Sequence, residues 1–315
     1  MKKELIDFSQ GLLALAPLAG YTDLPFRNVV KKFGADITFS EMISANALQH
    51  NSKKTFKMLE KSPLETPYIV QIAGSDLNAI KDAVEIINDI EGIDGIDLNC
   101  GCPVPKVVSQ NSGSSLLLDL PHLVKILETI KKHSNKQYTS AKVRLGFVEK
   151  IPEQIALAVQ SAGVDFMSIH GRTRAGAYKA PVDYDAIKRA RESVKIPVFA
   201  NGDITSYEKA CEVKQITGCN SLMIGRGAIG NPWIFYQLKH NMQDIDLAKK
   251  QEIILEHYDS MIEFYGEHGV SMFRKHLHTY SKGYAEASAF RNHINTITDV
   301  TLMRTELEKF FSIHH

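Results

Sequence analysis

Eight short apolar runs, with helical segments between them, constrain the fold of this 315-residue chain more than any other feature. Each run is apolar throughout instead of alternating with polar residues, which is typical of parallel strands buried on both faces of a sheet. The spacing of apolar residues predicts amphipathic helices between the runs, for example over 77–90, 120–130, 152–162 and 183–192. The predicted strands cover residues 12–16, 37–40, 68–72, 93–98, 141–145, 166–169, 197–200 and 221–224.

Eight strand and helix units in succession predict a (β/α)8 TIM barrel, an α/β fold. The alternation stops after Gly230, and the rest of the chain is predicted to be helical. We therefore expect a barrel domain over 1–240 and a small C-terminal helical domain over 241–315. A domain this small is near the lower limit for an independent core, so we expect it to pack on the barrel. The predicted C-terminal helices cover 233–239, 247–265, 272–284 and 286–311, the last of them broken.

Each of the eight runs ends in a polar, charged or conformationally special residue, and this register predicts where the active site lies. The carboxyl ends of barrel strands meet on one face, which carries the active sites of this fold. One polar strand end would be an ordinary loop start, but eight in register favour a functional site. In chain order the exits are Pro17, Glu41, Gln71, Asn99, Lys142 with Arg144, His170, Asn201, and Gly225 with Arg226.

The turn after the fourth run gathers Asn99, Cys100, Cys102 and Lys106. One interpretation is a reactive thiol beside a bound ligand. The other is an ordinary turn with compact buried cysteines, since a free cysteine usually behaves as a small apolar residue. If one thiol is reactive, we favour Cys102 over Cys100, because Pro103 makes the turn directly after it rigid.

Composition excludes several other classes. The formal net charge of +1 gives no global indication of a nucleic-acid partner, so any basic patch must be local. The four cysteines, at 100, 102, 211 and 219, match no paired zinc spacing, and we expect no metal. The start carries acidic residues where a signal peptide needs an apolar run, and no apolar stretch reaches membrane length. We expect a cytoplasmic enzyme with reduced thiols.

Two glycine-containing loops predict a phosphate site. Residues 225–230 match G-x-G-x-x-G, but they follow the last strand and only helices come after them, so we reject a Rossmann domain. In barrels, the loops after strands 7 and 8 commonly bind phosphate through backbone N–H groups. Residues 201–206 supply one such loop and residues 225–227 the other, with Arg226 adding a guanidinium. We therefore predict a phosphorylated cofactor placed across these two loops, at the ends of strands 7 and 8.

Lys142 and Arg144 lie on the same side of the fifth predicted strand, because side chains alternate with a period of two. Charges inside a packed barrel are costly unless they are paired, so these two are expected to face an anionic group. The alternative is a pair of ion pairs with Asp97 or Glu41.

A flavin would suit this anionic group. Lys142 would stabilise the negative charge of the reduced ring, Gln71 would hydrogen-bond its pyrimidine edge and His170 another polar edge. Hydride transfer to an activated carbon–carbon double bond then requires a proton donor. A thiol with a pKa near the ordinary value of about 8.5 can donate that proton, whereas a thiolate nucleophile would need an electropositive setting, to which Lys106 could contribute. We favour the acid role for Cys102.

Several motifs, in matching order across nearly the whole chain, resemble the bacterial tRNA-dihydrouridine synthases and most closely their B-type branch. The resemblance includes an Arg-Lys-His segment at 274–276 in the predicted helical domain. Cys100 is a departure, because members of the family more often carry an apolar residue there. The motifs cover residues 16–27, 40–43, 70–74, 99–103, 113–117, 169–174, 200–204 and 223–226.

The resemblance implies an FMN-dependent, NADPH-driven reduction of uridine in tRNA to 5,6-dihydrouridine. Hydride would reach C6 of the base, and Cys102 would give the proton to C5. The residues implied in substrate binding are Asn99, Lys106, Arg144, Arg172, Arg274 and Lys275. The residues implied in FMN binding are Pro17, Leu18, Ala19, Gln71, Lys142, His170, Asn201, Gly202, Asp203, Gly225 and Arg226.

A local basic patch supports an RNA substrate. Residues 271–293 hold four Lys or Arg and a single acidic residue, Glu286. Such a patch would contact phosphates while the target uridine is extruded into the barrel mouth, although most charge runs are simply solvated helix faces. Two other functions stay open: a dehydrogenase of a free pyrimidine, of the dihydroorotate type, and a tRNA-binding module without catalysis. We expect a monomer.

Overall fold

The computed structural model describes residues 5–49 and 53–313. The expectation that the chain starts without a signal peptide falls partly on residues 1–4, which lie outside the described residues.

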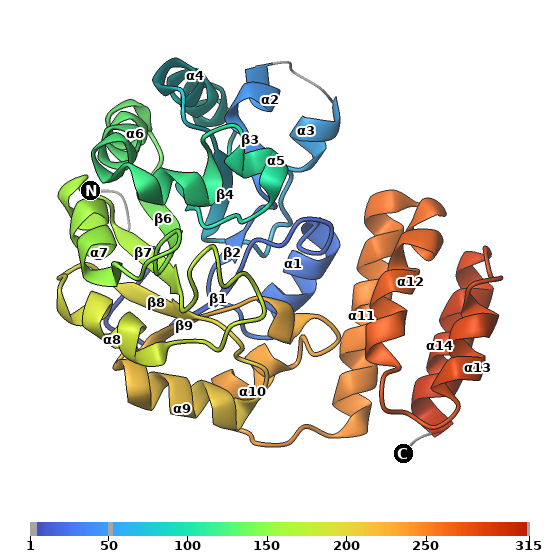
Figure 1. The fold of residues 1–315 in the computed structure, drawn as a ribbon. Coiled ribbons are helices and arrows are strands. Elements are labelled where there is room, and N and C mark those ends of the chain that lie inside the picture. Colours follow the sequence, from blue (N-terminus) through green and yellow to red (C-terminus); the bar gives the residue numbers. More distant parts are fainter. Residues whose placement is uncertain (1–4, 50–52, 314–315) are drawn as a thin grey trace.

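Eight parallel strands form a nearly closed barrel, which confirms the predicted TIM-barrel fold (Figure 1). The first strand pairs with the last, Leu13 opposite Leu222. The two strands at the remaining opening are joined by a backbone hydrogen bond of 3.0 Å from Leu15 N to Ile37 O. A short extra strand, β3 (Ile43–Ser44), also pairs with β4. The barrel strands are β1 (Leu13–Leu15), β2 (Thr38–Phe39), β4 (Tyr68–Ala73), β5 (Gly95–Cys100), β6 (Tyr138–Arg144), β7 (Phe166–His170), β8 (Val198–Asn201) and β9 (Ser221–Ile224).

The strand β6 begins three residues before the predicted start at 141. The sequence hides this start because Thr139 and Ser140 are polar, yet both are buried. The hydroxyl of Ser140 donates at 2.7 Å to Asp97, its register partner on the adjacent strand β5, which satisfies the buried hydroxyl. Strand β2, by contrast, covers fewer residues than the predicted range 37–40.

The two faces of each strand meet different surroundings. Outward-facing residues, such as Leu98 and Cys100, belong to the large apolar core between the sheet and the helices. Inward-facing residues fill the barrel. Its lower part is aromatic, with the ring of Phe166 centred 5.4 Å from that of Phe199 and 6.5 Å from that of Phe39. The inward positions nearer the carboxyl ends of the strands are polar, so the packed floor supports a polar mouth.

Helices surround the sheet on its outer face, and the predicted helices are confirmed within a few residues. Several begin at an acidic or hydroxyl cap: the Asp76 carboxylate accepts from Ala79 N at 2.8 Å, for example. The helices of this part are α1 (Leu24–Lys32), α2 (Ala45–Gln49), α3 (Lys53–Lys57), α4 (Leu77–Asn88), α5 (Pro105–Val108), α6 (Leu120–His133), α7 (Pro152–Ser161), α8 (Tyr184–Glu192), α9 (Tyr207–Thr217) and α10 (Ile234–His240), with short 3-10 helices at Gly113–Leu118 and Arg226–Ala228.

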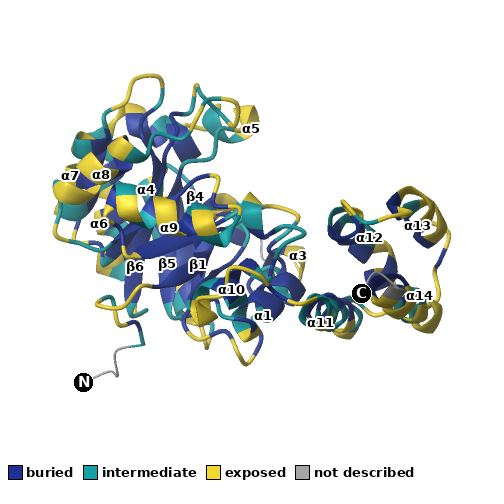
Figure 2. Ribbon diagram, turned by 90° about the horizontal axis from the view of Figure 1, so that it is seen from below, coloured by how far each residue is buried: buried dark blue, intermediate teal, exposed yellow. Residues whose placement is uncertain are grey.

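Four further helices form the C-terminal helical region, which has its own apolar cluster. The break predicted within 286–311 is confirmed, whereas the helix predicted at 272–284 lies at 268–280, because Gly266 ends the preceding helix. α11 lies against α1, and α13 and α14 lie furthest from the barrel (Figures 1 and 2). Lys32 pairs with Glu256 across this contact at 2.7 Å. The helices are α11 (Leu247–Tyr265), α12 (His268–Tyr280), α13 (Ala287–Ile294) and α14 (Val300–Ile313).

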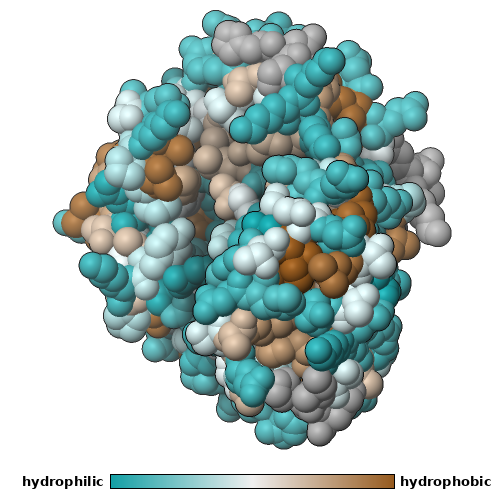
Figure 3. All heavy atoms as spheres, turned by 90° about the vertical axis from the view of Figure 1, so that its right-hand side faces the viewer, coloured by the Kyte–Doolittle hydropathy of each residue, from teal (hydrophilic) through white to brown (hydrophobic). Residues whose placement is uncertain are grey.

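The exposed face of the helical region is mostly hydrophilic, with apolar residues in separate patches (Figure 3). Among the described residues, no helix is both long and apolar enough to cross a membrane.

Candidate active site

A cavity of about 710 Å³ opens at the carboxyl ends of the barrel strands. Seven of the eight predicted strand exits line it. The exception is Glu41, whose carboxylate instead accepts from the backbone N–H of Gly20. The predicted site residues that line the cavity are Pro17, Leu18, Ala19, Gln71, Asn99, Cys102, Lys142, Arg144, His170, Asn201, Gly202, Asp203, Gly225 and Arg226.

Four predicted site residues do not line the cavity. Lys106 is exposed on α5. Arg172 is buried behind the cavity wall, where its two terminal nitrogens bind the Asp203 carboxylate at 2.9 and 2.5 Å. Arg274 donates to Ile297 O at 2.7 Å within the helical region. Lys275 lies nearer the cavity rim, where its amine donates to Gly20 O.

A chain of hydrogen bonds, called here the polar relay, crosses the wall from Ser140 to the turn that carries Cys102. The Asp97 carboxylate accepts from the Ser140 hydroxyl at 2.7 Å and from Gln71 Nε2 at 2.7 Å. Gln71 Oε1 accepts from Asn99 Nδ2 at 2.7 Å. Asn99 Oδ1 accepts from the backbone N–H groups of Gly101 and Cys102, at 3.1 and 2.9 Å. The amide of Asn99 therefore shapes the turn directly.

The two thiols of this turn have different surroundings. Cys100 is fully buried in the outer core, and burial raises its pKa well above the ordinary value. Cys102 is half-buried and lines the cavity. Its carbonyl accepts from the hydroxyl and the N–H of Ser114, at 2.8 and 3.1 Å. Cys100 thus has the environment of a compact apolar residue, and Cys102 is placed to meet a ligand.

Lys142 and Arg144 bring positive charge into the wall without a carboxylate partner. Within the described part of the chain neither forms an ion pair, so the alternative pairing with Asp97 or Glu41 is not formed. Lys142 donates to Asn201 Oδ1 at 3.2 Å. Burial, and then the charge of Arg144, lower the pKa of Lys142 to about 8.

Arg144 holds backbone instead of an anion. Its guanidinium donates to the carbonyls of Gly101, Thr173 and Ala177, at 2.7, 3.0 and 3.0 Å. These bonds tie the Cys102 turn to the loop after β7. Nearby His170 is uncharged at neutral pH, because burial and the neighbouring cations hold its pKa far below the ordinary value.

The far end of the cavity has the backbone and charge expected of a phosphate site. Asp203 is bound by Arg172 and also by Arg226 Nη2 at 3.1 Å, so its negative charge is compensated. Gly202 has a φ of 137°, which favours glycine. A Cβ atom at Gly227 would lie 1.9 Å from Ile204 O, so only glycine fits between the two loops.

Tyr178 and Thr279 are among the cavity residues that the sequence analysis did not predict. Tyr178, from the loop after β7, lies between two cations, with its ring centre 5.5 Å from the Arg144 guanidinium and 4.5 Å from that of Arg226. Thr279 reaches the cavity from α12, in the helical region. Neither has a signal in the sequence, because a loop and a separately folded helix carry them to the site.

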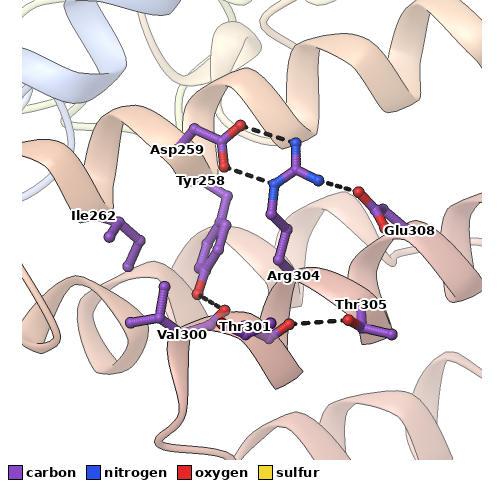
Figure 4. Close-up of a pocket in the computed structure, with 8 residues that line it drawn as sticks. All are labelled: Tyr258, Asp259, Ile262, Val300, Thr301, Arg304, Thr305 and Glu308. Atoms are coloured by element: carbon purple, nitrogen blue, oxygen red, sulfur yellow. Dashed lines mark hydrogen bonds and ion pairs between the residues drawn. The ribbon is translucent and has the colours of Figure 1, made fainter.

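A second cavity, of about 350 Å³, lies between α11 and α14 (Figure 4). Arg304 borders it, but Asp259 and Glu308 already pair with that guanidinium. Tyr258 donates its hydroxyl hydrogen to Val300 O at 2.8 Å. These polar groups of the second cavity are therefore already paired, and we assign the cavity no chemical role. Across the described residues, no group of three or more His, Cys, Asp or Glu could hold a metal ion.

A thiol, amides and buried cations gather at the strand ends of this (β/α)8 barrel. That arrangement is typical of an enzyme with this fold. A family model described as Dihydrouridine synthase (Dus) matches residues 14–313. The chain belongs to the dihydrouridine synthase family and is an oxidoreductase.

Individual relatives agree with the family model, and the resemblance inferred from the sequence motifs is confirmed. The protein named "Probable tRNA-dihydrouridine synthase" in Helicobacter pylori is 54% identical over 301 residues, covering 95% of this chain and 92% of that protein. The "tRNA-dihydrouridine synthase B" of Vibrio parahaemolyticus is 38% identical over 308 residues, covering 95% of each.

Solved structures with little sequence identity share the fold. The old yellow enzyme from Trypanosoma cruzi matches with a TM-score of 0.55 at 8% identity, over 80% of this chain and 93% of that one. Histamine dehydrogenase from Rhizobium sp. 4-9 matches with a TM-score of 0.57 at 12% identity, over 79% of this chain and 48% of that one.

Proposed function

We propose that this protein is a tRNA-dihydrouridine synthase that uses FMN and NADPH to reduce uridine in tRNA. The observation that carries the proposal is a single cavity that joins Cys102, Lys142 and both glycine loops. Family membership supports the reaction type, and the names of the relatives support tRNA as the substrate. Such a substrate would place the enzyme in the cytoplasm, and we propose that it acts as a monomer.

The cavity residues fit FMN. A volume of about 710 Å³ lies within the usual range for cofactor sites, roughly 300–1,000 Å³. Gly202, Gly225 and Arg226 would hold the phosphate. Lys142 and Gln71 would meet polar edges of the ring, and His170 would offer a neutral imidazole. Lys142 and Arg144, which form no ion pair within the described part of the chain, suit an anionic ligand.

Bound FMN would supply the hydride for C6 of the uracil ring. The remaining steps belong to the chain itself. Negative charge develops on the substrate next to the reduced carbon, and the Cys102 thiol donates the proton that C5 needs. Asn99 keeps the Cys102 turn in place through its two backbone hydrogen bonds. Arg144 supports the same turn from the opposite side through Gly101 O.

The helical region would hold the tRNA. Lys282 is exposed and Arg291 half-buried, so both are available for phosphates. α12 carries Lys275 to the rim and Thr279 into the wall, so one helix connects the basic surface to the reaction site. We also propose that residues 241–315 form the tRNA-binding domain and residues 1–240 the catalytic domain.

The test is whether the protein forms dihydrouridine in tRNA. Full-length protein loaded with FMN is incubated with NADPH and unmodified tRNA, and mass spectrometry of the digested RNA detects dihydrouridine and its position. Reduction of free uracil derivatives without reduction of tRNA would favour the dihydroorotate-type alternative instead. Protein that binds no flavin, even after FMN is added, would leave only a tRNA-binding role.

A further inference from the structure

We propose that Asp97 is a positioning residue that fixes the amides of Gln71 and Asn99 and, through them, the turn that carries Cys102. Its importance for proton donation rests on the proposed function, whereas its effect on the thiol does not. The sequence analysis treated Asp97 only as a candidate ion-pair partner of Lys142 or Arg144, and the structure gives it this different set of contacts.

The two ends of the polar relay fix the direction of every hydrogen bond within it. An ionised carboxylate only accepts, so Gln71 must turn Nε2 toward Asp97. Its Oε1 is then left to accept from Asn99 Nδ2. At the other end backbone N–H groups only donate, so Asn99 Oδ1 must face Gly101 and Cys102. One orientation of the two amides satisfies both ends.

Because the three side chains of the relay are buried, water cannot easily replace their hydrogen-bond partners. Asp97 is 1% exposed, Gln71 0% and Asn99 8%. Burial raises the pKa of Asp97 to about 6, against the opposing effect of the hydrogen bonds from Ser140 and Gln71. The carboxylate is therefore ionised at pH 7.5, the state in which it accepts from both neighbours.

The relay also determines what the wall offers to a bound molecule. Asn99 Oδ1 already accepts two hydrogen bonds, and one hydrogen of its Nδ2 is given to Gln71. The second N–H of Asn99 is then its free polar group, and Asn99 lines the cavity. It is suited to a carbonyl oxygen of a ligand.

The test measures how fast iodoacetamide alkylates Cys102 at pH 7.5. It uses flavin-free, full-length protein with the background substitution Cys211→Ser, because Cys211 is exposed while Cys100 and Cys219 are buried. Asp97→Leu keeps a similar shape but offers Gln71 no acceptor. We expect alkylation to be faster by about fivefold, because the amides of Gln71 and Asn99 that hold the turn are then no longer fixed by an acceptor. If this variant does not fold, Asp97→Ala removes the same acceptor.

Two controls separate the relay from other effects. Asp97→Asn still presents an oxygen to Gln71, while the Ser140 hydroxyl turns to accept from the new amide, so its rate should stay within about twofold of the parent. Ser168→Ala removes another buried hydroxyl from the barrel, on β7, and should leave the rate unchanged. Equal acceleration in D97L and D97N would show that charge, not the acceptor, matters and would overturn the proposal. An unchanged rate in D97L would do the same.

A double-mutant cycle tests the connection itself. Asn99→Ala removes the bonds to the turn directly and should also speed alkylation. If Asp97 acts through Asn99, D97L combined with N99A should be no faster than the faster single variant. If the rate increases of the two single variants multiply in the double variant, the two residues act independently, which would contradict the relay. In turnover assays, D97L should lower kcat with little change in KM for tRNA. A parent protein that makes no dihydrouridine would refute the proposed function and leave the alkylation result to decide on Asp97.

Discussion

The amine of Lys142 on β6 lies 3.2 Å from Oδ1 of Asn201 on β8, so it is held across the strand between them. With a pKa of about 8, this amine loses its charge just above neutral pH. A ligand that needs the charged amine must then bind together with a proton.

FMN affinity of the flavin-free protein should therefore fall as the pH rises through about 8. The loss should reach about tenfold by one pH unit above the pKa, because the charged fraction falls tenfold per unit. Lys142→Met should bind more weakly and lose this dependence. Flavin fluorescence titrations between pH 6.5 and 9 measure both. The same slope in K142M would assign the effect to another group.

Cys102→Ala should bind FMN and let NADPH reduce it at the normal rate, yet form dihydrouridine more slowly by about 10²–10⁴-fold, the usual contribution of a positioned acid. Single-turnover mass spectrometry of tRNA measures the product. Cys100→Ala is the matched control, since that thiol faces the outer core, and it should keep its rate. Normal product formation by C102A would rule out the acid role.

Removing a single partner of the buried pair Arg27–Glu65 should destabilise the fold strongly. The two side chains are 1% and 0% exposed and lie 2.7 Å apart. Arg27→Met leaves the Glu65 carboxylate buried and uncompensated, at a cost of about 3–5 kcal/mol in the free energy of unfolding. Urea denaturation followed by circular dichroism gives this value. The double variant Arg27→Met with Glu65→Gln should recover part of the loss.

Acid should weaken the contact between the barrel and the helical region through His276. Its ring stacks on Phe26 of α1 at 5.6 Å, and neither of its ring nitrogens has a hydrogen-bond partner among the described residues. Burial lowers its pKa to about 3, so the unfolded chain binds a proton that the folded one does not. Stability is therefore complete above about pH 6.5 and falls as the pH drops below it, by about 2 kcal/mol at pH 5.

The comparison of urea denaturation at pH 5 and pH 7.5 measures this dependence. His276→Phe should flatten it, whereas His278→Phe, at an exposed position of the same helix, should not. An equal acid sensitivity in H276F and the parent would point to other buried bases, such as His257.

Neutralising the basic patch should weaken tRNA binding in a way that depends on salt. Lys282→Ala and Arg291→Ala should each reduce the slope of log affinity against log salt by about 0.7–0.9, the effect of one lost phosphate contact. Filter binding between 50 and 200 mM salt measures the slope. Lys195→Ala is the control, because Lys195 precedes β8 and so lies at the opposite end of the barrel. An unchanged slope in the two patch variants would place the RNA elsewhere.

Most of the barrel and its polar mouth could be predicted from the sequence, because parallel strands must bring their carboxyl ends together. The alternation within β5 also predicts that Asn99 faces the interior and Cys100 the helices, whereas Cys102 lies in the turn beyond the strand. Arg172 shows the limit of this reasoning. The resemblance implied a ligand contact for Arg172, and nothing in the sequence indicated that its guanidinium pairs with Asp203. Thr279 could not be found, because its place depends on how two separate cores dock.

Thr279 makes the cavity a joint property of both halves of the molecule. A barrel without α12 would keep its floor, its thiol and its cations, but would lack the part of the wall that Thr279 supplies. Discrimination between a nucleotide in a folded RNA and a free base can therefore be built at this seam. A change in how the helical region packs on α1 can alter this discrimination while every reactive group stays in place.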